Sequence, residues 1–135
     1  MNYFLDTNIC IYFLKGEYDG IAKNLGLLNP ANIKIASIVK AELLFGAEKS
    51  KRKKQNLDII NKFLNPYEVV SFDDKATEFY SKIRFSLSAK GKIIGPNDLI
   101  IASIVLANDG ILVTKNVKEF QRIVNLKIED WTITK

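Results

Sequence analysis

Short apolar runs alternate with amphipathic stretches of helical length along the whole chain. Parallel strands need a long crossover connection, which is usually a helix, so this alternation predicts βα units. We therefore expect an α/β fold with a central, mainly parallel β-sheet flanked by helices on both faces. The expected strands are 3–5, 33–36, 67–71, 111–114 and 126–128, and the expected helices are 8–15, 21–28, 37–47, 51–64, 74–90, 96–107 and 117–122.

Capping residues support several of these boundaries. Ser37 and Asp73 are typical residues for capping the start of a helix, and Gly95-Pro96 places a proline in the first turn of a later one. No linker rich in Gly, Ser or Pro divides the sequence, and no long repeat recurs. We therefore expect a single domain over residues 1–135.

The chain has no histidine and a single cysteine. The absence of histidine excludes Ser-His-Asp and Cys-His catalytic schemes, histidine-ligated zinc sites, and ribonuclease mechanisms in which histidine is the general acid or base. Any catalytic chemistry must therefore depend on carboxylates, lysine, hydroxyl groups or a hard metal ion held by oxygen. The lone Cys10 cannot form an internal disulfide, which suits a reducing cytoplasm.

The balance of charges and the apolar pattern narrow the setting further. Lys and Arg number 20 and Asp and Glu 15, so the formal net charge is +5. This excess permits a polyanionic partner without requiring one. No apolar run approaches the length of about 18 residues that a membrane span needs. The N-terminus has an acid at position 6 and no basic start, so we expect no signal peptide and a cytoplasmic protein.

Three acidic residues stand out by their positions. Asp6 directly follows the first expected strand, Glu42 borders the apolar stripe of a helix, and Asp98 lies in the first turn of a later helix. Each has a structural alternative: a helix cap, a side chain that reaches to solvent, and an anion stabilised by the helix dipole. Together they place acids near one rim of a parallel sheet, where the functional crevice of such folds lies.

Carboxylates gathered at one rim repel one another, and a divalent cation relieves that repulsion. Oxygen ligands without histidine favour Mg²⁺, with Mn²⁺ as a substitute, over zinc. The sequence has no GxGxxG, GxxxxGK[ST] or GxSxG motif, so it has no fingerprint of a dinucleotide fold, a P-loop NTPase or an α/β-hydrolase. A Mg²⁺-binding phospho-acceptor signalling domain is an alternative, although no suitable aspartate follows the strand expected at 33–36.

Five segments spread over nearly the whole chain carry a resemblance to a known family. The segments are 4–8 (FLDTN), 37–43 (SIVKAEL), 94–102 (IGPNDLIIA), 112–120 (LVTKNVKEF) and 129–131 (EDW). In this combination they resemble the PIN-domain ribonucleases, and in particular the VapC toxins of bacterial toxin–antitoxin pairs. The IGPND and TxNxxEF variants are most similar to the VapC subgroup that cleaves initiator tRNA.

The resemblance implies a PIN-like fold and a Mg²⁺-dependent endoribonuclease that hydrolyses RNA phosphodiester bonds, with initiator tRNA as the expected substrate. Asp6, Glu42 and Asp98 would form the catalytic site, with Asp6 and Asp98 as direct metal ligands. Glu42 would orient or deprotonate the attacking water. Many PIN domains have a fourth acid where this chain has Asn116, so Glu119, one helical turn later, is a further catalytic candidate. Its alternative is a surface glutamate of a short helix.

Four residues are expected to contact the substrate, and three of them have a plainer alternative. Thr114 and Asn116 could bind a metal water or a phosphate, or simply form a turn. Arg84 could contact a phosphate or an acid of an inhibitor, or be a plain surface residue. Asn8 follows the first acid in the matched motif. The basic stretch 49–54 could hold the tRNA backbone, or be a solvated face.

The resemblance also implies partners. A cognate VapB-type antitoxin would wrap the groove and place a basic side chain into the acidic site. We expect a homodimer and a toxin–antitoxin hetero-oligomer that binds operator DNA only through the antitoxin. A catalytically inactive PIN-like nucleic-acid-binding module remains an alternative, because Asn116 replaces the fourth acid.

Overall fold

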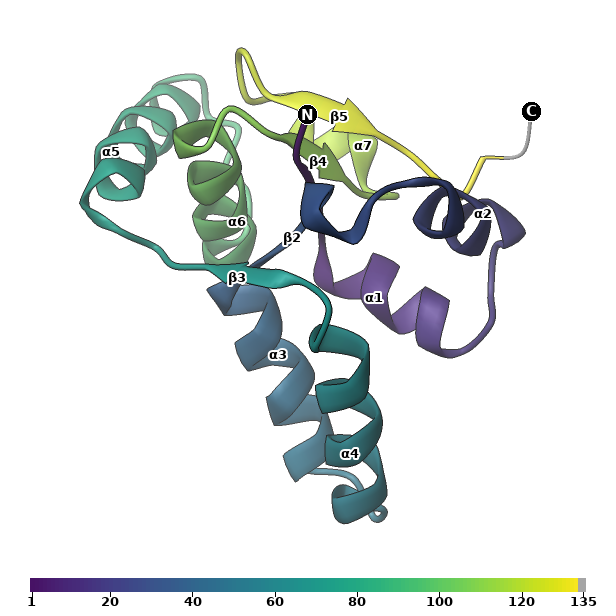
Figure 1. The fold of residues 1–135 in the computed structure, drawn as a ribbon. Helices are drawn as coiled ribbons and strands as arrows, with labels where there is room; N and C mark the ends of the chain where they lie inside the picture. Colours follow the sequence, from purple (N-terminus) through teal and green to yellow (C-terminus); the bar gives the residue numbers. More distant parts are fainter. Residues whose placement is uncertain (134–135) are drawn as a thin grey trace.

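The computed structural model describes residues 1–133 and consists of a five-stranded sheet between layers of helices (Figure 1). Every pair of neighbouring strands is parallel, and the order across the sheet is β3-β2-β1-β4-β5. The expected α/β class with a mainly parallel sheet is therefore confirmed. The strands are β1 (Tyr3–Leu5), β2 (Ile33–Ala36), β3 (Glu68–Val70), β4 (Ile111–Val113) and β5 (Lys127–Glu129).

The helices divide between the two sides of the sheet. Helices α5 and α6 pack against each other on one side, and α1 and α2 lie on the other (Figure 1). Helices α3 and α4 form a hairpin that projects away from the sheet. The helices are α1 (Thr7–Leu14), α2 (Asp19–Leu27), α3 (Ser37–Glu48), α4 (Lys53–Leu64), α5 (Asp74–Ala89), α6 (Pro96–Ala107) and α7 (Val117–Phe120), with a 3-10 turn at Pro30–Asn32.

The expected elements are present with boundaries shifted by at most two residues, but one expected cap is wrong. Asp73 caps α5 by accepting a hydrogen bond from the Ala76 amide at 3.0 Å. Ser37, in contrast, is already the first helical residue of α3, and no side chain caps that helix. The reason is that β2 ends at Ala36 and α3 begins at the next residue, so no loop residue remains between them to act as a cap.

The core surrounds the central strands and the inner helix α6. Phe4 and Leu5 of β1 are buried, and all of β4 is buried. Helix α6 is apolar on nearly every side, which is typical of a helix enclosed by the fold rather than lying on it. Gly110 joins α6 to β4, and a Cβ atom there would lie 2.7 Å from the Phe4 ring. Only glycine therefore fits this junction without displacing the central strand.

The order of the strands creates a switch point beside β1. The chain proceeds outward from β1 to β2 and β3, and later returns to place β4 and β5 on the opposite side of β1. In open α/β sheets the binding crevice lies outside the carboxyl ends of the strands at such a point. Asp6 follows β1 and Thr114 follows β4, so these two residues flank the switch point.

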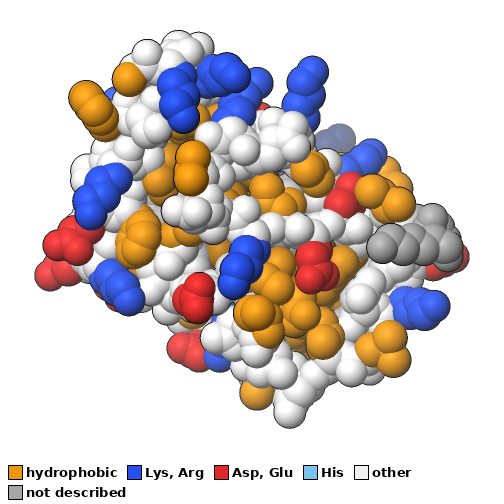
Figure 2. All heavy atoms as spheres, turned by 90° about the horizontal axis from the view of Figure 1, so that it is seen from above, with side chains coloured by type: hydrophobic (Ala, Val, Ile, Leu, Met, Phe, Trp, Pro, Cys, Tyr) orange, Lys and Arg blue, Asp and Glu red, His pale blue; other side chains and the backbone are white. Residues whose placement is uncertain are grey.

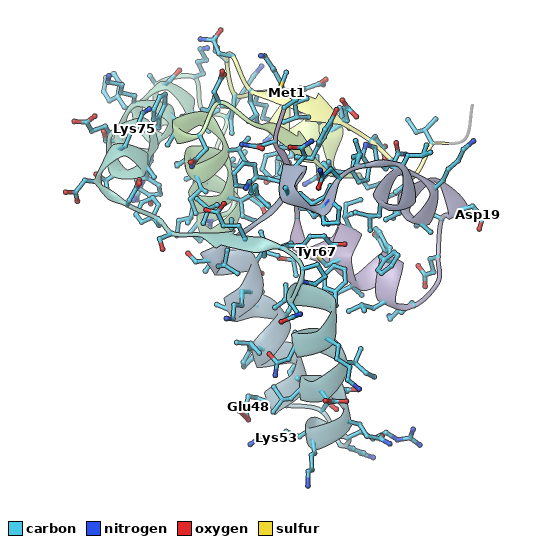
Figure 3. The ribbon with its side chains drawn as sticks, in the orientation of Figure 1. Met1, Asp19, Glu48, Lys53, Tyr67 and Lys75 are labelled. Carbon is cyan, nitrogen blue, oxygen red and sulfur yellow. The ribbon has the colours of Figure 1, made fainter. Side chains whose placement is uncertain are left out.

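The α3–α4 hairpin carries most of the basic stretch 49–54 at its far end. In Figure 3, Glu48 and Lys53 lie at the tip of the hairpin, remote from the sheet, whereas Tyr67 lies at its base. An ion pair of 2.7 Å joins Lys53 to Glu48 across this tip. Among the helices of residues 1–133, none is both long and apolar enough to cross a membrane.

Candidate active site

Asp6 lies at the junction of β1 and α1 and is only 7% exposed. Its backbone amide donates to the Val113 carbonyl at 3.1 Å, which ties it to the neighbouring strand, and its Oδ1 accepts from the Ile9 amide at 2.9 Å. Burial raises the pKa of Asp6, while hydrogen bonds from Thr114 and Ile9 lower it and the nearby charges of Glu42 and Asp130 raise it. The net effect is a raised pKa, so the folded structure disfavours the ionised form of Asp6.

Glu42 is half-buried on α3 and is anchored by a residue of another helix. The hydroxyl of Thr7, the first residue of α1, donates to Oε1 of Glu42 at 2.8 Å. Because Thr7 directly follows Asp6, this hydrogen bond holds the Glu42 carboxylate close to the junction of β1 and α1. The bond occupies one carboxylate oxygen of Glu42 and leaves the other available.

Asp98 is half-buried in the first turn of α6, which begins with Pro96. Burial, followed by the charges of Glu119, Asp6 and Glu42, raises the pKa of Asp98 to about 6. These charge effects mean that three acids from other parts of the chain lie within electrostatic reach of Asp98. We call these four residues, Asp6, Glu42, Asp98 and Glu119, the acid group.

Glu119 enters the acid group from α7 and is held by two donors. Its Oε2 accepts from the Asn116 side chain at 2.8 Å, and its Oε1 accepts from the Gly95 amide at 3.4 Å. The backbone amide of Asn116 donates to the hydroxyl of Thr114 at 3.0 Å. The loop after β4 is thus linked to the start of α6, and Thr114 and Asn116 orient members of the acid group.

Two of the residues expected to contact substrate lie outside this network. Asn8 is exposed on α1, directly before the buried residues Ile9 and Cys10. Arg84 is exposed on α5, where its guanidinium donates to the Tyr80 hydroxyl at 3.1 Å and lies over the Tyr80 ring. It lines a cavity together with Pro96 at the start of α6, and it does not neutralise the acid group.

Sequence reasoning missed two residues that the fold brings to the site. Thr7 anchors Glu42, although the matched motif assigned it no role. Asp130 follows β5 as Asp6 follows β1, and its charge raises the pKa of Asp6. The backbone amide and the hydroxyl of Thr132 both donate to Oδ1 of Asp130, at 2.9 Å and 2.6 Å. Asp130 could have been predicted from the sequence, because it closely follows an expected parallel strand, where binding sites of such sheets lie.

The composition of the acid group decides which metal ions it suits. Its donors are carboxylate oxygens alone, and none of its members forms an ion pair within residues 1–133. In the same residues, no three acidic, histidine or cysteine side chains converge closely enough to hold a metal by themselves. These properties fit a hard cation that is bound through one or two carboxylates and keeps several of its waters.

Comparison with known proteins places this arrangement in a family. The PIN domain family matches the chain over residues 3–126. The chain is 48% identical over 132 residues to "Ribonuclease VapC2" of Rickettsia felis, covering 97% of this chain and 98% of that protein. It is 37% identical over 131 residues to "tRNA(fMet)-specific endonuclease VapC" of Salmonella typhimurium, covering 97% and 98%.

Solved structures agree with this placement. The fold matches the VapBC2 structure of Rickettsia felis bound to a DNA fragment from its promoter, with a TM-score of 0.91, 47% identity, and coverage of 97% of this chain and 99% of that one. It also matches DNA-bound VapBC of Salmonella typhimurium, with a TM-score of 0.91, 37% identity, and coverage of 97% and 98%. FitAcB of Neisseria gonorrhoeae, at 20% identity over 96% and 97% and a TM-score of 0.86, shares the fold.

Proposed function

Because this chain belongs to the PIN domain family, we propose that it is a metal-dependent endoribonuclease and the toxin of a toxin–antitoxin pair. The acid group is the observation that carries the proposal. Burial and like charges raise the pKa of Asp98 to about 6, and no ion pair within residues 1–133 neutralises any of the four acids. Such a group is unfavourable without a cation and suits one that binds there.

The proposed cofactor is Mg²⁺, with Mn²⁺ as a substitute, held by Asp6 and Asp98. Burial raises the pKa of both acids, and carboxylate oxygens without histidine match the preference of these ions. A bound divalent cation lowers the pKa of a coordinated water and offsets charge on the phosphoryl oxygens.

The remaining members of the site position the reacting groups. Thr7 occupies Oε1 of Glu42, so Oε2 is the oxygen that accepts the proton of the attacking water. Asn116 and the Gly95 amide hold Glu119, which keeps this acid beside Asp98. Attack of water on phosphorus breaks the bond to the 3′ oxygen, so the products carry 5′-phosphate and 3′-hydroxyl ends.

The proposed substrate is a tRNA, and initiator tRNA in particular. The support is the name of the relative from Salmonella typhimurium, a tRNA(fMet)-specific endonuclease that aligns with 97% of this chain. Such a substrate places the proposed activity in the cytoplasm. Asn8, which is exposed two residues after Asp6, and Arg84, which lines a cavity with Pro96, remain proposed substrate contacts together with Asn116. Thr114 is fully buried and hydrogen-bonds Asp6, so its expected contact with the substrate is replaced by a role in holding this acid.

The proposed partner is a VapB-type antitoxin that blocks the acid group. Matched structures with 37–47% identity are VapBC complexes, and two of them contain bound DNA. We therefore propose a toxin homodimer within a toxin–antitoxin hetero-oligomer, in which the antitoxin contacts operator DNA. Leu14, Leu43 and Ile60 line a cavity together with Glu42, where α1 meets the α3–α4 hairpin, and this cavity is suited to an apolar segment of such a partner.

Cleavage of tRNA tests the proposed activity. The purified chain is incubated with initiator tRNA and total tRNA in Mg²⁺, with and without EDTA, beside Asp98→Asn. An Asp58→Asn variant is the matched control, because Asp58 is an exposed acid on α4 whose one ion-pair partner within residues 1–133 is Lys62. Cleavage that needs Mg²⁺ and survives only in wild type and Asp58→Asn supports the proposal.

Two outcomes contradict the proposal. Equal cleavage by Asp98→Asn and wild type would assign the activity to a contaminant, and the chain would then be an inactive binding module. A 2′,3′-cyclic phosphate at the cut ends would rule out attack by water.

A further inference from the structure

A cavity on the surface beside α7 is lined almost entirely by cations. Its volume is about 520 Å³, and its lining residues are Lys92, Lys118, Gln121 and Arg122. All four are exposed, and none of the three cations takes part in an ion pair within residues 1–133. Figure 2 shows Lys and Arg side chains gathered along one edge of the face seen from above, while the acids on that face are scattered.

This arrangement has no evident role in stability. Lys118 and Arg122 are four residues apart in and just after α7, a spacing at which like charges repel when the backbone is helical. Lys92 adds a third positive charge from the segment before α6. The Arg122 guanidinium donates to the Ile93 carbonyl at 3.2 Å, which fixes this side chain at the cavity instead of leaving it free in solvent.

The cavity is connected to the acid group through the same two segments. Glu119 lies between Lys118 and Gln121 in α7, and its carboxylate accepts from the Gly95 amide. Gly95 lies three residues after Lys92 and three before Asp98. A ligand seated on the cations would therefore lie next to the segments that carry two of the four acids.

We infer that Lys92, Lys118 and Arg122 bind backbone phosphates of the RNA substrate beside the cleavage point. This inference rests on the proposed ribonuclease function and names the surface on which its substrate lies. Cations without carboxylate partners attract phosphates in a manner that does not depend on base sequence. The tRNA strand runs from the acid group onto this cavity.

The basic stretch at the tip of the α3–α4 hairpin is the competing surface. It is remote from the sheet, and one of its lysines, Lys53, is already paired with Glu48 at 2.7 Å (Figure 3). It provides a matched control, since two lysines can be neutralised there with the same loss of net charge. The test compares Lys118→Gln/Arg122→Gln with Lys53→Gln/Lys54→Gln.

Binding is measured by fluorescence anisotropy with fluorescein-labelled initiator tRNA over a range of salt concentrations. Both pairs are placed in Asp98→Asn to prevent cleavage. The cavity pair should weaken binding about tenfold and lower the slope of log affinity against log salt by about 1 to 2, since each phosphate contact contributes about 0.7 to 0.9. The hairpin pair should change affinity less than twofold. In the active chain, the cavity pair should raise KM and leave kcat nearly unchanged.

A charge-preserving variant guards against a folding defect. Lys118→Arg/Arg122→Lys should bind tRNA within about threefold of the parent, whereas misfolding caused by changes at these positions would weaken it as well. Equal losses from the cavity and hairpin pairs would overturn the inference, because they would show a response to net charge alone. If the cavity pair binds tRNA normally but loses binding to polyglutamate, the inference is overturned, and the cavity binds an acidic protein segment instead.

The outcomes also separate this inference from the proposed function. If the wild type cleaves tRNA but the cavity pair binds and cleaves normally, the inference fails and the ribonuclease function stands. If the wild type does not cleave but the cavity pair loses tRNA binding, the ribonuclease function fails and the phosphate site stands.

Discussion

Among single residues, Asp98 is strongly affected by its burial and by neighbouring acids. Its pKa is about 6 in the folded chain because it is half-buried and faces Glu119, Asp6 and Glu42. In the unfolded chain the same carboxyl returns to about 3.8. The folded state therefore binds this proton more tightly than the unfolded state does, and ionised Asp98 opposes folding.

This difference predicts a pH dependence of stability in metal-free buffer. Ionised Asp98 lowers the free energy of unfolding above pH 6, and the loss disappears as the pH falls from about 6 to about 4. Asp98→Asn should therefore be more stable than wild type at pH 7 and equal to it near pH 4. Urea unfolding of both chains across this range measures the difference, and a gap that widens toward acid pH would contradict the assignment.

Thr7 leads to a second prediction at the level of a single side chain. Thr7→Val removes the hydroxyl that donates to Glu42 but keeps the shape of the residue. We expect kcat for tRNA cleavage to fall about tenfold to a hundredfold, because a misplaced base costs about that much. The free energy of unfolding should fall by about 1 kcal/mol, the usual value of one hydrogen bond.

Thr7→Ser is the control for this prediction, since it keeps the hydroxyl. It should retain most of the activity in a kinetic assay. Full kcat in Thr7→Val would show that Glu42 does not depend on this anchor.

At the level of elements, the junctions between helices and strands control where the acids lie. Asp6, Thr114 and Asp130 each follow directly after a strand, so the register of the parallel sheet sets their relative heights. Glu42 and Asp98 depend instead on how α3 and α6 pack against that sheet, and these two helices also contact each other. A shift of either helix would separate the acid group without altering any of its residues.

The tight junction at Gly110 gives a prediction about stability. Gly110→Ala should lower the free energy of unfolding by about 1–3 kcal/mol, because the new Cβ would lie 2.7 Å from the Phe4 ring and 3.1 Å from the Asn2 carbonyl. Gly46→Ala is the matched control. Gly46 lies inside α3, and an added Cβ there would have no neighbouring atom within 4 Å. The alanine substitution should therefore raise the free energy of unfolding by about 0.5–1 kcal/mol.

Urea unfolding distinguishes the two glycine substitutions. Opposite signs are expected because one position is limited by space and the other by the flexibility of glycine in a helix. A stabilised Gly110→Ala would contradict the tight packing of β1 against the α6–β4 junction.

For the whole molecule, the proposed metal site predicts that metal binding stabilises the fold. A cation that binds only the folded chain stabilises it by about 2.7 kcal/mol at a hundredfold excess over its Kd. We therefore expect saturating Mg²⁺ to raise the Tm of the wild type by about 5–10 °C. Asp98→Asn should lose most of this increase. Asp58→Asn should keep it, because Asp58 is exposed on α4, outside the acid group.

Differential scanning fluorimetry with MgCl₂, and with NaCl at equal ionic strength, measures this coupling. An equal rise of Tm in Asp6→Asn, Asp98→Asn and wild type would place the bound Mg²⁺ away from the acid group. This outcome would contradict the proposed metal site even if the fold and family stand.

Reasoning from the sequence recovered the elements, the parallel sheet and the position of Asp6 after the first strand, because these follow from neighbours in the chain. Hydrophobic period, prolines and capping residues act over a few positions, so they can be read without a fold. Ser37 shows the limit of local patterns: it does not cap α3, because β2 continues directly into this helix.

What local patterns could not supply are contacts between residues far apart in the chain. The hydrogen bond from Thr7 to Glu42 spans 35 positions, and the charges that raise the pKa of Asp98 come from three other elements. The cationic cavity likewise brings Lys92 together with Lys118 and Arg122, although α6 and β4 lie between them in the chain. Hydrogen bonds, desolvation and Coulomb interactions depend on distance in space, and that distance is defined only when the strands take the order β3-β2-β1-β4-β5 and the helices pack against them.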